Sequence, residues 1–187
     1  MSLEEKATIS PKEIVLRPAS TDDSEFLIRV YSNVRREEMA SWGWSPAQQA
    51  AFVRMQYDAR QRGYAAEYPS VETSIISVGG ESVGSMIVHR CPSEVRLVDI
   101  SLLPESRGRG IGGELIGRLK SEAARSTVPL RLSVLRGNPA AHLYERLGFI
   151  AKGGDAMYDE MEWIAAQGSG NFENTSLENG AHAGKSE

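Results

Sequence analysis

The sequence predicts an α/β protein of the α+β type, in which one mixed β-sheet is flanked by helices on both faces. Two observations predict this class. Short apolar segments suited to strands alternate with segments whose apolar residues recur every three or four positions, in the order β-α-α-β-β-β-α-β-α-β-β. The 187 residues suffice for one domain with a buried core. We assign that domain to residues 12–164.

The N-terminal half is predicted to contain a strand, two helices and a hairpin. The strand spans 13–19, and the following Thr-Asp-Asp-Ser-Glu run supplies the capping oxygens and acids that favour a helix start. The segment Ser-Trp-Gly-Trp-Ser-Pro interrupts this helix, and a second begins near Pro46. The apolar period then changes, and the segments 71–78 and 81–90, joined by Gly-Gly, indicate a hairpin.

The C-terminal half is predicted to alternate strands with helices before it loses its apolar residues. The expected elements are a strand at 95–103, a helix at 110–125, a strand at 130–136, a helix at 138–149 that ends at Gly148, and two last strands in Phe-Ile-Ala-Lys-Gly and Met-Tyr-Asp-Glu-Met-Glu-Trp. We expect residues 1–11 to be a flexible N-terminus and 165–187 to be a disordered polar tail.

Composition narrows the class of partner and the compartment. A net charge of -4 argues against a general nucleic-acid binder, which would be basic. A single cysteine, Cys91, excludes an internal disulfide and fits a reducing compartment. Because no apolar run reaches the length of a membrane span and the N-terminus lacks an apolar signal core, we expect a cytoplasmic protein without a membrane partner. A homodimer is compatible with the chain.

Glycines and arginines are concentrated in Pro-Glu-Ser-Arg-Gly-Arg-Gly-Ile-Gly-Gly-Glu-Leu-Ile-Gly, residues 104–117. This run contains G-x-G-x-x-G, but four residues separate it from the preceding strand, and too little chain follows for a dinucleotide-binding fold. It also lacks the G-K-[ST] end of a Walker loop. Both of these phosphate motifs are therefore excluded by their context.

The same run has the chemistry of an anion cradle at a strand-to-helix junction. Glycines let backbone N–H groups approach an anion, and the helix N-terminus adds partial positive charge. Arg107 and Arg109 add full charges, so the junction is suited to a pyrophosphate. The alternative is tight helix–sheet packing with solvated arginines, in which Gly113 and Gly117 would form a packing pair.

Two motifs in residues 95–163 resemble the GNAT N-acetyltransferases. Arg107, Gly110 and Gly112 match the family's central Gln/Arg-x-x-Gly-x-Gly/Ala motif. A strand, an Asn and a helix follow, and this second motif matches at Leu143, Tyr144, Gly148 and Phe149. The N-terminal half resembles the family only in the order of its elements. The resemblance implies the GNAT fold, with acetyl-CoA as co-substrate and no metal.

The resemblance also implies where acetyl-CoA binds. The strands 95–103 and 130–136 would part, and pantetheine would enter the gap along Ile100, Ser101 and Leu102. The pyrophosphate would lie on Arg107, Gly108, Arg109, Gly110, Ile111, Gly112 and Gly113. Asn138 corresponds to the family's helix-start Asn but lies six residues before Tyr144 rather than seven. A cofactor contact and simple helix capping therefore explain Asn138 equally well.

Acyl transfer to an amine needs a base, an oxyanion donor and an acid. The resemblance implies that Tyr144 is the acid that protonates the leaving thiolate, and that a strand N–H is the oxyanion donor. Asp99 lies in an otherwise apolar strand, where desolvation would raise its pKa towards that of a base. A structural acid bonded to a neighbouring segment is an equally good interpretation. Glu81, Glu37, Glu38 and ordered water are rival bases.

We therefore expect an N-acetyltransferase that moves an acetyl group from acetyl-CoA to a primary amine by direct attack in a ternary complex. The main alternative is a non-catalytic acyl-CoA-binding regulatory module, and a weaker one is transfer to a hydroxyl or thiol. Trp42 and Trp44 are candidates for the wall of an acceptor pocket, or for plugs of the core. His89 and His142 show no metal-ligand spacing.

Overall fold

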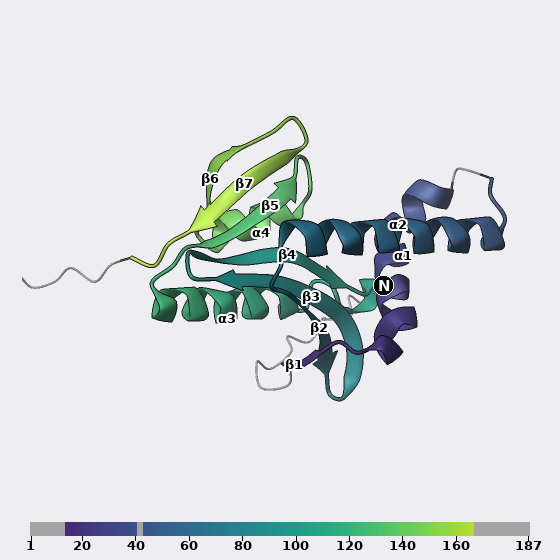
Figure 1. Ribbon diagram of the computed structural model, residues 1–187, viewed down its shortest axis with the longest axis horizontal. Helices are drawn as coiled ribbons and strands as arrows, with labels where there is room; N and C mark the ends of the chain where they lie inside the picture. The colour runs from purple at the N-terminus through teal and green to yellow at the C-terminus, as the bar shows by residue number, and fades with distance from the viewer. Residues whose placement is uncertain (1–13, 41–42, 167–187) are drawn as a thin grey trace, which may run out of the picture.

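The computed structural model describes residues 14–40 and 43–166, without the side chains of 34–40, and this part forms one seven-stranded sheet with helices on both faces (Figure 1). The strands are β1 (Ile14–Pro18), β2 (Val71–Val78), β3 (Glu81–Cys91), β4 (Glu94–Leu102), β5 (Leu130–Leu135), β6 (Ile150–Gly154) and β7 (Tyr158–Trp163). The helices are α1 (Ser24–Ala40), α2 (Pro46–Glu67), α3 (Ile111–Ser126) and α4 (Ala140–Arg146), with 3-10 turns η2 (Thr21–Asp23) and η3 (Pro104–Ser106). The predicted α/β class is confirmed. The predicted tail at 165–187 and N-terminus at 1–11 lie almost wholly outside the described residues.

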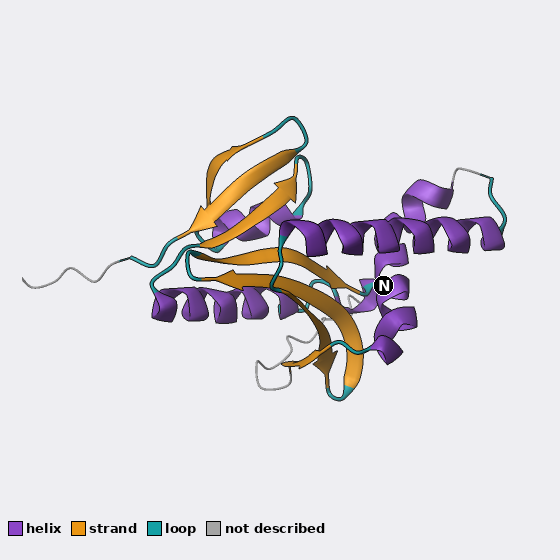
Figure 2. Cartoon of the chain, in the orientation of Figure 1, coloured by secondary structure: helices purple, strands orange, loops and turns teal. Residues whose placement is uncertain are grey.

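The sheet has the order β1-β2-β3-β4-β5-β7-β6, and its only parallel neighbours in the described chain are β4 and β5. These two strands pair only where Val95–Leu97 meets Leu130–Leu132. Beyond Leu97 they part, and β5, β7 and β6 turn away from the rest of the sheet (Figure 2). The sheet therefore opens at the carboxyl ends of its two central strands.

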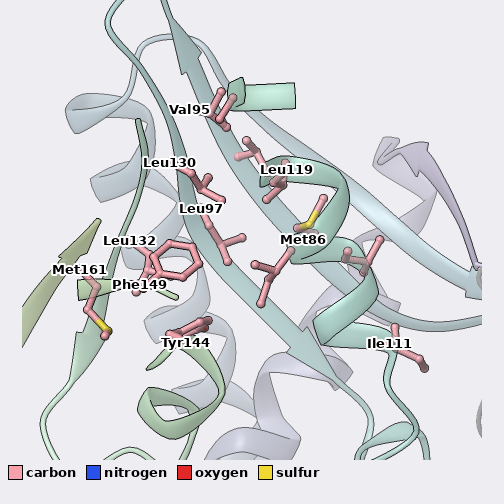
Figure 3. Packing of buried hydrophobic residues seen from close by; sticks show 14 of the residues in the cluster. Met86, Val95, Leu97, Ile111, Leu119, Leu130, Leu132, Tyr144, Phe149 and Met161 are labelled. Atoms are coloured by element: carbon pink, nitrogen blue, oxygen red, sulfur yellow. The ribbon is translucent and has the colours of Figure 1, made fainter. Parts of the chain in front are cut away.

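The main core lies between the sheet and the helices α3 and α4. Alternate residues of the central strands point into it, and α3 contributes a fully buried stripe (Figure 3). Leu115 and Ile116 have no exposed surface, as is also the case for Leu130. The spacing of the stripe is that of an amphipathic helix, and the alternation is that of strands buried on one face. Burial of each such side chain is worth ~1.5–3 kcal/mol.

The helices α1 and α2 cover part of the opposite face. They cover the polar side chains of Ser85 and Asp99 and the apolar side chain of Ile87. A bulge puts Asp99 there. Ile87 pairs with Asp99 but Val88 pairs with Leu97, so Val98 is the extra residue of β4. Without the bulge, Leu97 and Asp99 would share the α3 face, because strand side chains alternate.

The fourth helix is shorter than the sequence predicts. We expect a helix over 138–149, whereas α4 spans only Ala140–Arg146. Asn138 and Pro139 form its entry, and Gly148 has a φ of 83°, a left-handed conformation that ends the helix. The N–H of Phe149 then bonds to the carbonyl oxygen of Tyr144 at 3.0 Å, which returns the chain to the sheet.

Candidate active site

A cavity of about 520 Å³ lies where β4 and β5 part, and we call it the splay cavity. Most of its wall comes from one side of α2 with Arg60 and Tyr64, from the ends of β4 and β5, and from the entry and body of α4 with Asn138 and Tyr144. Tyr31 of α1 and Tyr158 of β7 complete it. Because the splay removes the β-ladder here, the edges of two strands are available to a ligand. This cavity is the only described one that contains both predicted catalytic residues.

Tyr144 contributes a buried ring and a hydroxyl without a partner in the described chain. The residue is 8% exposed and its ring packs against Phe149 with centroids 5.9 Å apart. Burial, and then the nearby charge of Asp99, raise the pKa of Tyr144 to about 12. The hydroxyl therefore keeps its proton at neutral pH. A protonated group at the splay cavity can act as a proton donor.

Asp99 is held by an arginine that the sequence analysis did not single out. Its Oδ1 lies 2.5 Å from Nη2 of Arg60, and its Oδ2 accepts a hydrogen bond from the Ser101 hydroxyl at 3.0 Å. Burial alone would lower the pKa of Arg60, but Asp99 and then Tyr64 outweigh it and raise that pKa. Arg60 Nε also donates to the Tyr64 hydroxyl at 2.7 Å. This geometry matches the interpretation of Asp99 as a structural acid that is bonded to a neighbouring segment.

The start of α3 has the geometry expected for a cradle. Gly108 and Gly110 have φ values of 70° and 84°, which glycine adopts at low cost. The first helical hydrogen bond runs from the N–H of Glu114 to the carbonyl of Gly110, so the three preceding amides have no partner within the helix. They belong to Ile111, Gly112 and Gly113. A helix N-terminus with such amides is suited to a phosphate.

The alternative that Gly113 and Gly117 form a packing pair is wrong. A Cβ at either position would meet no atom within 4 Å, so neither glycine is required by a close helix–sheet contact. Gly112 has only an ordinary contact, because its Cβ would lie 3.8 Å from a methyl group of Leu143. Open space beside the first turns of α3 leaves room for the backbone to meet a pyrophosphate. The glycine-rich start of α3 therefore fits this part of acetyl-CoA.

The remaining predicted cofactor residues border the same region. Ile100, Ser101 and Leu102 pair with β3 on one side and have no β5 partner on the other. Arg107 Nε donates to the carbonyl oxygen of Leu102 at 2.9 Å, which ties the loop to the end of β4, while Arg109 is half-buried.

Asn138 has features of both of its proposed roles. Its side-chain oxygen accepts from the N–H of Ala140 at 2.9 Å, which is the capping interaction, and the residue also lines the splay cavity. The two roles are compatible, because the capping bond engages the side-chain oxygen and leaves the side-chain NH₂ group to donate to a ligand.

Several other candidates lie away from the splay cavity. Trp44 is 38% exposed and meets Phe52 edge-on at 5.2 Å, so it neither fills the core nor lines a described cavity. The expectation that Trp44 plugs the core is therefore wrong, its place in the wall of an acceptor pocket stays a prediction, and Trp42 lies outside the described residues. Glu81 is exposed at the start of β3 and lines none of the described cavities. The side chains of Glu37 and Glu38 are not described.

A second cavity of about 400 Å³ adjoins the splay cavity, and we call it the outer cavity. Tyr64, Val98, Ser133 and Tyr158 line both. The outer cavity continues from these residues to Glu67 and Tyr68 at the end of α2 and to Asp155, Glu160 and Arg96 on the sheet side. Sequence reasoning missed all of them. The spacing of Arg60, Tyr64 and Glu67 on one side of α2 was the available signal.

The comparison with protein families identifies the class of this protein as an acetyltransferase. Residues 69–151 match the family model for an acetyltransferase (GNAT) domain. Residues 69–151 therefore form a GNAT acetyltransferase domain, as the two motifs predict. No curated protein sequence matches the chain closely enough to count as a relative.

Solved structures share the fold at low identity. PaiA N-acetyltransferase from Thermoplasma acidophilum, in complex with coenzyme A, is 20% identical with a TM-score of 0.62, and the match covers 81% of this chain and 99% of that one. A histone acetyltransferase HPA2 and related acetyltransferase from Corynebacterium glutamicum is 19% identical with a TM-score of 0.60, covering 84% and 99%. An acetyltransferase from Thermus thermophilus is 20% identical with a TM-score of 0.59, covering 81% and 97%. At such identities the likeness establishes the fold.

The described residues contain neither a membrane-spanning helix nor a cluster of metal ligands. Over 14–40 and 43–166, no helix combines the length and apolar character that crossing a bilayer requires. Within the same ranges, His, Cys, Asp and Glu side chains do not gather into a group that could hold a metal ion.

Proposed function

We propose that the protein transfers an acetyl group from acetyl-CoA to a primary amine by direct attack in a ternary complex. One observation carries the proposal. The parting of β4 and β5 opens a slot lined by Tyr144, and Gly112 at the start of α3 lies beside Leu143 of the same helix as Tyr144. The slot and cradle fit pantetheine and pyrophosphate, and the hydroxyl fits the leaving thiolate. The coenzyme A complex of the Thermoplasma neighbour supports the same choice of co-substrate.

Acetyl-CoA would supply the thioester that this chemistry needs. In the proposed reaction the amine nitrogen bonds to the acetyl carbon, the C–S bond breaks, and the thiolate takes a proton. Tyr144 donates that proton, because its raised pKa keeps the hydroxyl neutral, and it regains one from the amine. Backbone N–H groups of β4 beyond Leu97, which lack a β5 partner, are proposed as donors to the oxyanion.

We propose that Asp99 positions other groups rather than accepting the amine proton. Its two oxygens are already bonded to Arg60 and Ser101. This arrangement fastens α2 to β4 directly after the Val98 bulge. Ordered water is then the proposed acceptor of any proton that the incoming amine loses before attack.

A two-part experiment tests the function. Acetyl-CoA is expected to raise Tm, because it binds the native chain and not the unfolded chain. A panel of amines is then assayed for release of free thiol from acetyl-CoA, with hydroxyl and thiol acceptors as the alternative class. Thiol release with an amine, and a matching acetylated product, supports the proposal. A rise in Tm without transfer to any acceptor would instead favour the regulatory module.

A further inference from the structure

The outer cavity has a charge and a lining that the acetyl-transfer chemistry does not require. Glu67, Asp155 and Glu160 contribute three carboxylates, and Arg96 contributes one guanidinium, so negative charge is in excess by two. Three tyrosines, Tyr64, Tyr68 and Tyr158, form its aromatic walls. Aromatic faces and carboxylates together attract cations, whereas they repel anions.

The carboxylates are held in place but are not saturated. Asp155 Oδ1 accepts the N–H groups of Met157 and Tyr158 at 2.7 Å each, which lowers the pKa of Asp155. Glu67 Oε1 accepts the Tyr68 hydroxyl at 2.7 Å. The second oxygen of each carboxylate has no hydrogen bond within the described chain, so it is available to a ligand.

Glu160 is the carboxylate that Arg96 neutralises. Its Oε2 lies 3.1 Å from Nη1 of Arg96, and its Oε1 accepts the Ser133 hydroxyl. Arg96 also pairs with Glu94 at 3.0 Å and lies over the Tyr68 ring, 5.9 Å from its centroid. The Tyr68 ring therefore already binds one cation, the guanidinium of Arg96. The free negative charge is concentrated at Glu67 and Asp155.

The outer cavity is continuous with the site of the chemistry. Tyr64, Val98, Ser133 and Tyr158 line both cavities, and along β4 the outer cavity reaches Arg96 while the splay cavity reaches Ile100. Four residues of strand span roughly 10 Å, given the rise per residue and the bulge. A flexible amine of that length could place one nitrogen in the splay cavity and a second group in the outer cavity.

We propose that the acceptor is an extended amine with at least two cationic nitrogens, a diamine or polyamine. One amine is neutral and reacts in the splay cavity, while the other remains an ammonium bound by Glu67, Asp155 and the tyrosine walls. This inference rests on the proposed function, because it names the acceptor class for the same reaction. It makes Glu67 a residue that determines specificity and has no part in the acyl transfer itself.

Two acceptors of equal length test the proposal: diaminooctane, and aminooctanol, in which a hydroxyl replaces the distal ammonium. We expect kcat/KM to be at least tenfold higher for diaminooctane, mainly through KM. In Glu67→Gln this preference should fall roughly fivefold, because an exposed charge contributes modestly. Asp58→Asn removes the same charge from an exposed position of the same helix outside both cavities, and it should leave the preference unchanged.

The outcomes separate the inference from the function beneath it. Equal use of the two acceptors, or equal effects of Glu67→Gln and Asp58→Asn, would overturn the inference and leave the acetyltransferase intact. The same conclusion would follow if an unrelated monoamine were acetylated and diaminooctane were not. If no amine were acetylated and acetyl-CoA left Tm unchanged, the proposed function would fail and the inference with it.

Discussion

The two faces of the sheet differ in what they bury. The face under α3 and α4 is an apolar core, with Leu130 and Leu132 of β5 almost fully buried. The opposite face carries Arg131 and Ser133 from the same strand, together with the two polar cavities and the Arg60–Asp99 pair. The apolar face therefore supplies most of the stability, while the polar face can retain groups that suit a ligand rather than the fold.

The largest expected effect comes from neighbours on β5 that point to opposite faces. Leu132→Ala removes a side chain that is 1% exposed and should destabilise the protein by ~2–5 kcal/mol through lost burial and a cavity. Ser133→Ala removes an exposed hydroxyl and should cost less than ~1 kcal/mol. Urea unfolding of both variants measures the difference. Similar losses would contradict the division between the faces.

The next effect concerns the open end of the splay. Gly113→Glu places a carboxylate near the amides at the start of α3, and its Cβ meets no protein atom within 4 Å, so the variant should fold but reject a pyrophosphate. The stabilisation by acetyl-CoA, about 2.7 kcal/mol at one hundred times Kd, should be lost. Gly117→Glu, one turn further along the same side of α3, is the matched control. A full Tm shift in Gly113→Glu would place the cradle elsewhere.

Gly113 is a better position for this test than Gly110. Gly110 has a φ of 84°, so any side chain there would be strained, and a lost Tm shift could reflect misfolding. At Gly113 the backbone is helical and the neighbouring space is open.

The third effect concerns Tyr144, whose ring packs in the apolar core and which also lines the splay cavity. Tyr144→Phe keeps the buried ring and removes the hydroxyl that lines the splay cavity. We expect kcat to fall ~10–100-fold with little change in acetyl-CoA affinity, because general acid catalysis acts in the transition state. Steady-state kinetics with chemistry as the slow step measures it. A Phe variant with an unchanged kcat would remove Tyr144 from the mechanism.

The smallest effect is on stability at alkaline pH. The folded pKa of Tyr144 is raised to about 12, chiefly by burial, from an ordinary value near 10. Its contribution is complete below the unfolded pKa and is lost as pH rises through the folded pKa, so the window is about pH 10–12. At pH 11 the loss is about 1.4 kcal/mol relative to pH 9.

Tyr144→Phe should remove that part of the alkaline loss. Urea unfolding of wild type and variant at pH 9 and pH 11 gives the difference between their losses. An equal loss in both proteins would show that the hydroxyl is not desolvated in the folded state.

Local sequence patterns were sufficient to predict most helices and strands and the glycine-rich junction at the start of α3. Gly108 and Gly110 have a left-handed backbone conformation that favours glycine whatever surrounds them, so the junction could be inferred from the run of residues alone. The length of α4 could not, because the entry at Asn138 and Pro139 and the left-handed Gly148 trim both ends of the predicted helix and leave Ala140–Arg146. The capped start of α2, by contrast, is a local signal at Ser45 and Pro46.

The sequence by itself determined the order of the elements, the apolar face of the sheet and the GNAT motifs, because each depends on residues close together in the chain. The tertiary structure decided where Asp99 points. The Val98 bulge moves it to the α2 face, where Arg60, distant in sequence, pairs with it. It also decided the outer cavity, whose acids and tyrosines come from the end of α2 and the β6–β7 hairpin, while β4 supplies Arg96 and β5 supplies Ser133. No local pattern encodes such a set, because its members meet only when separate elements pack.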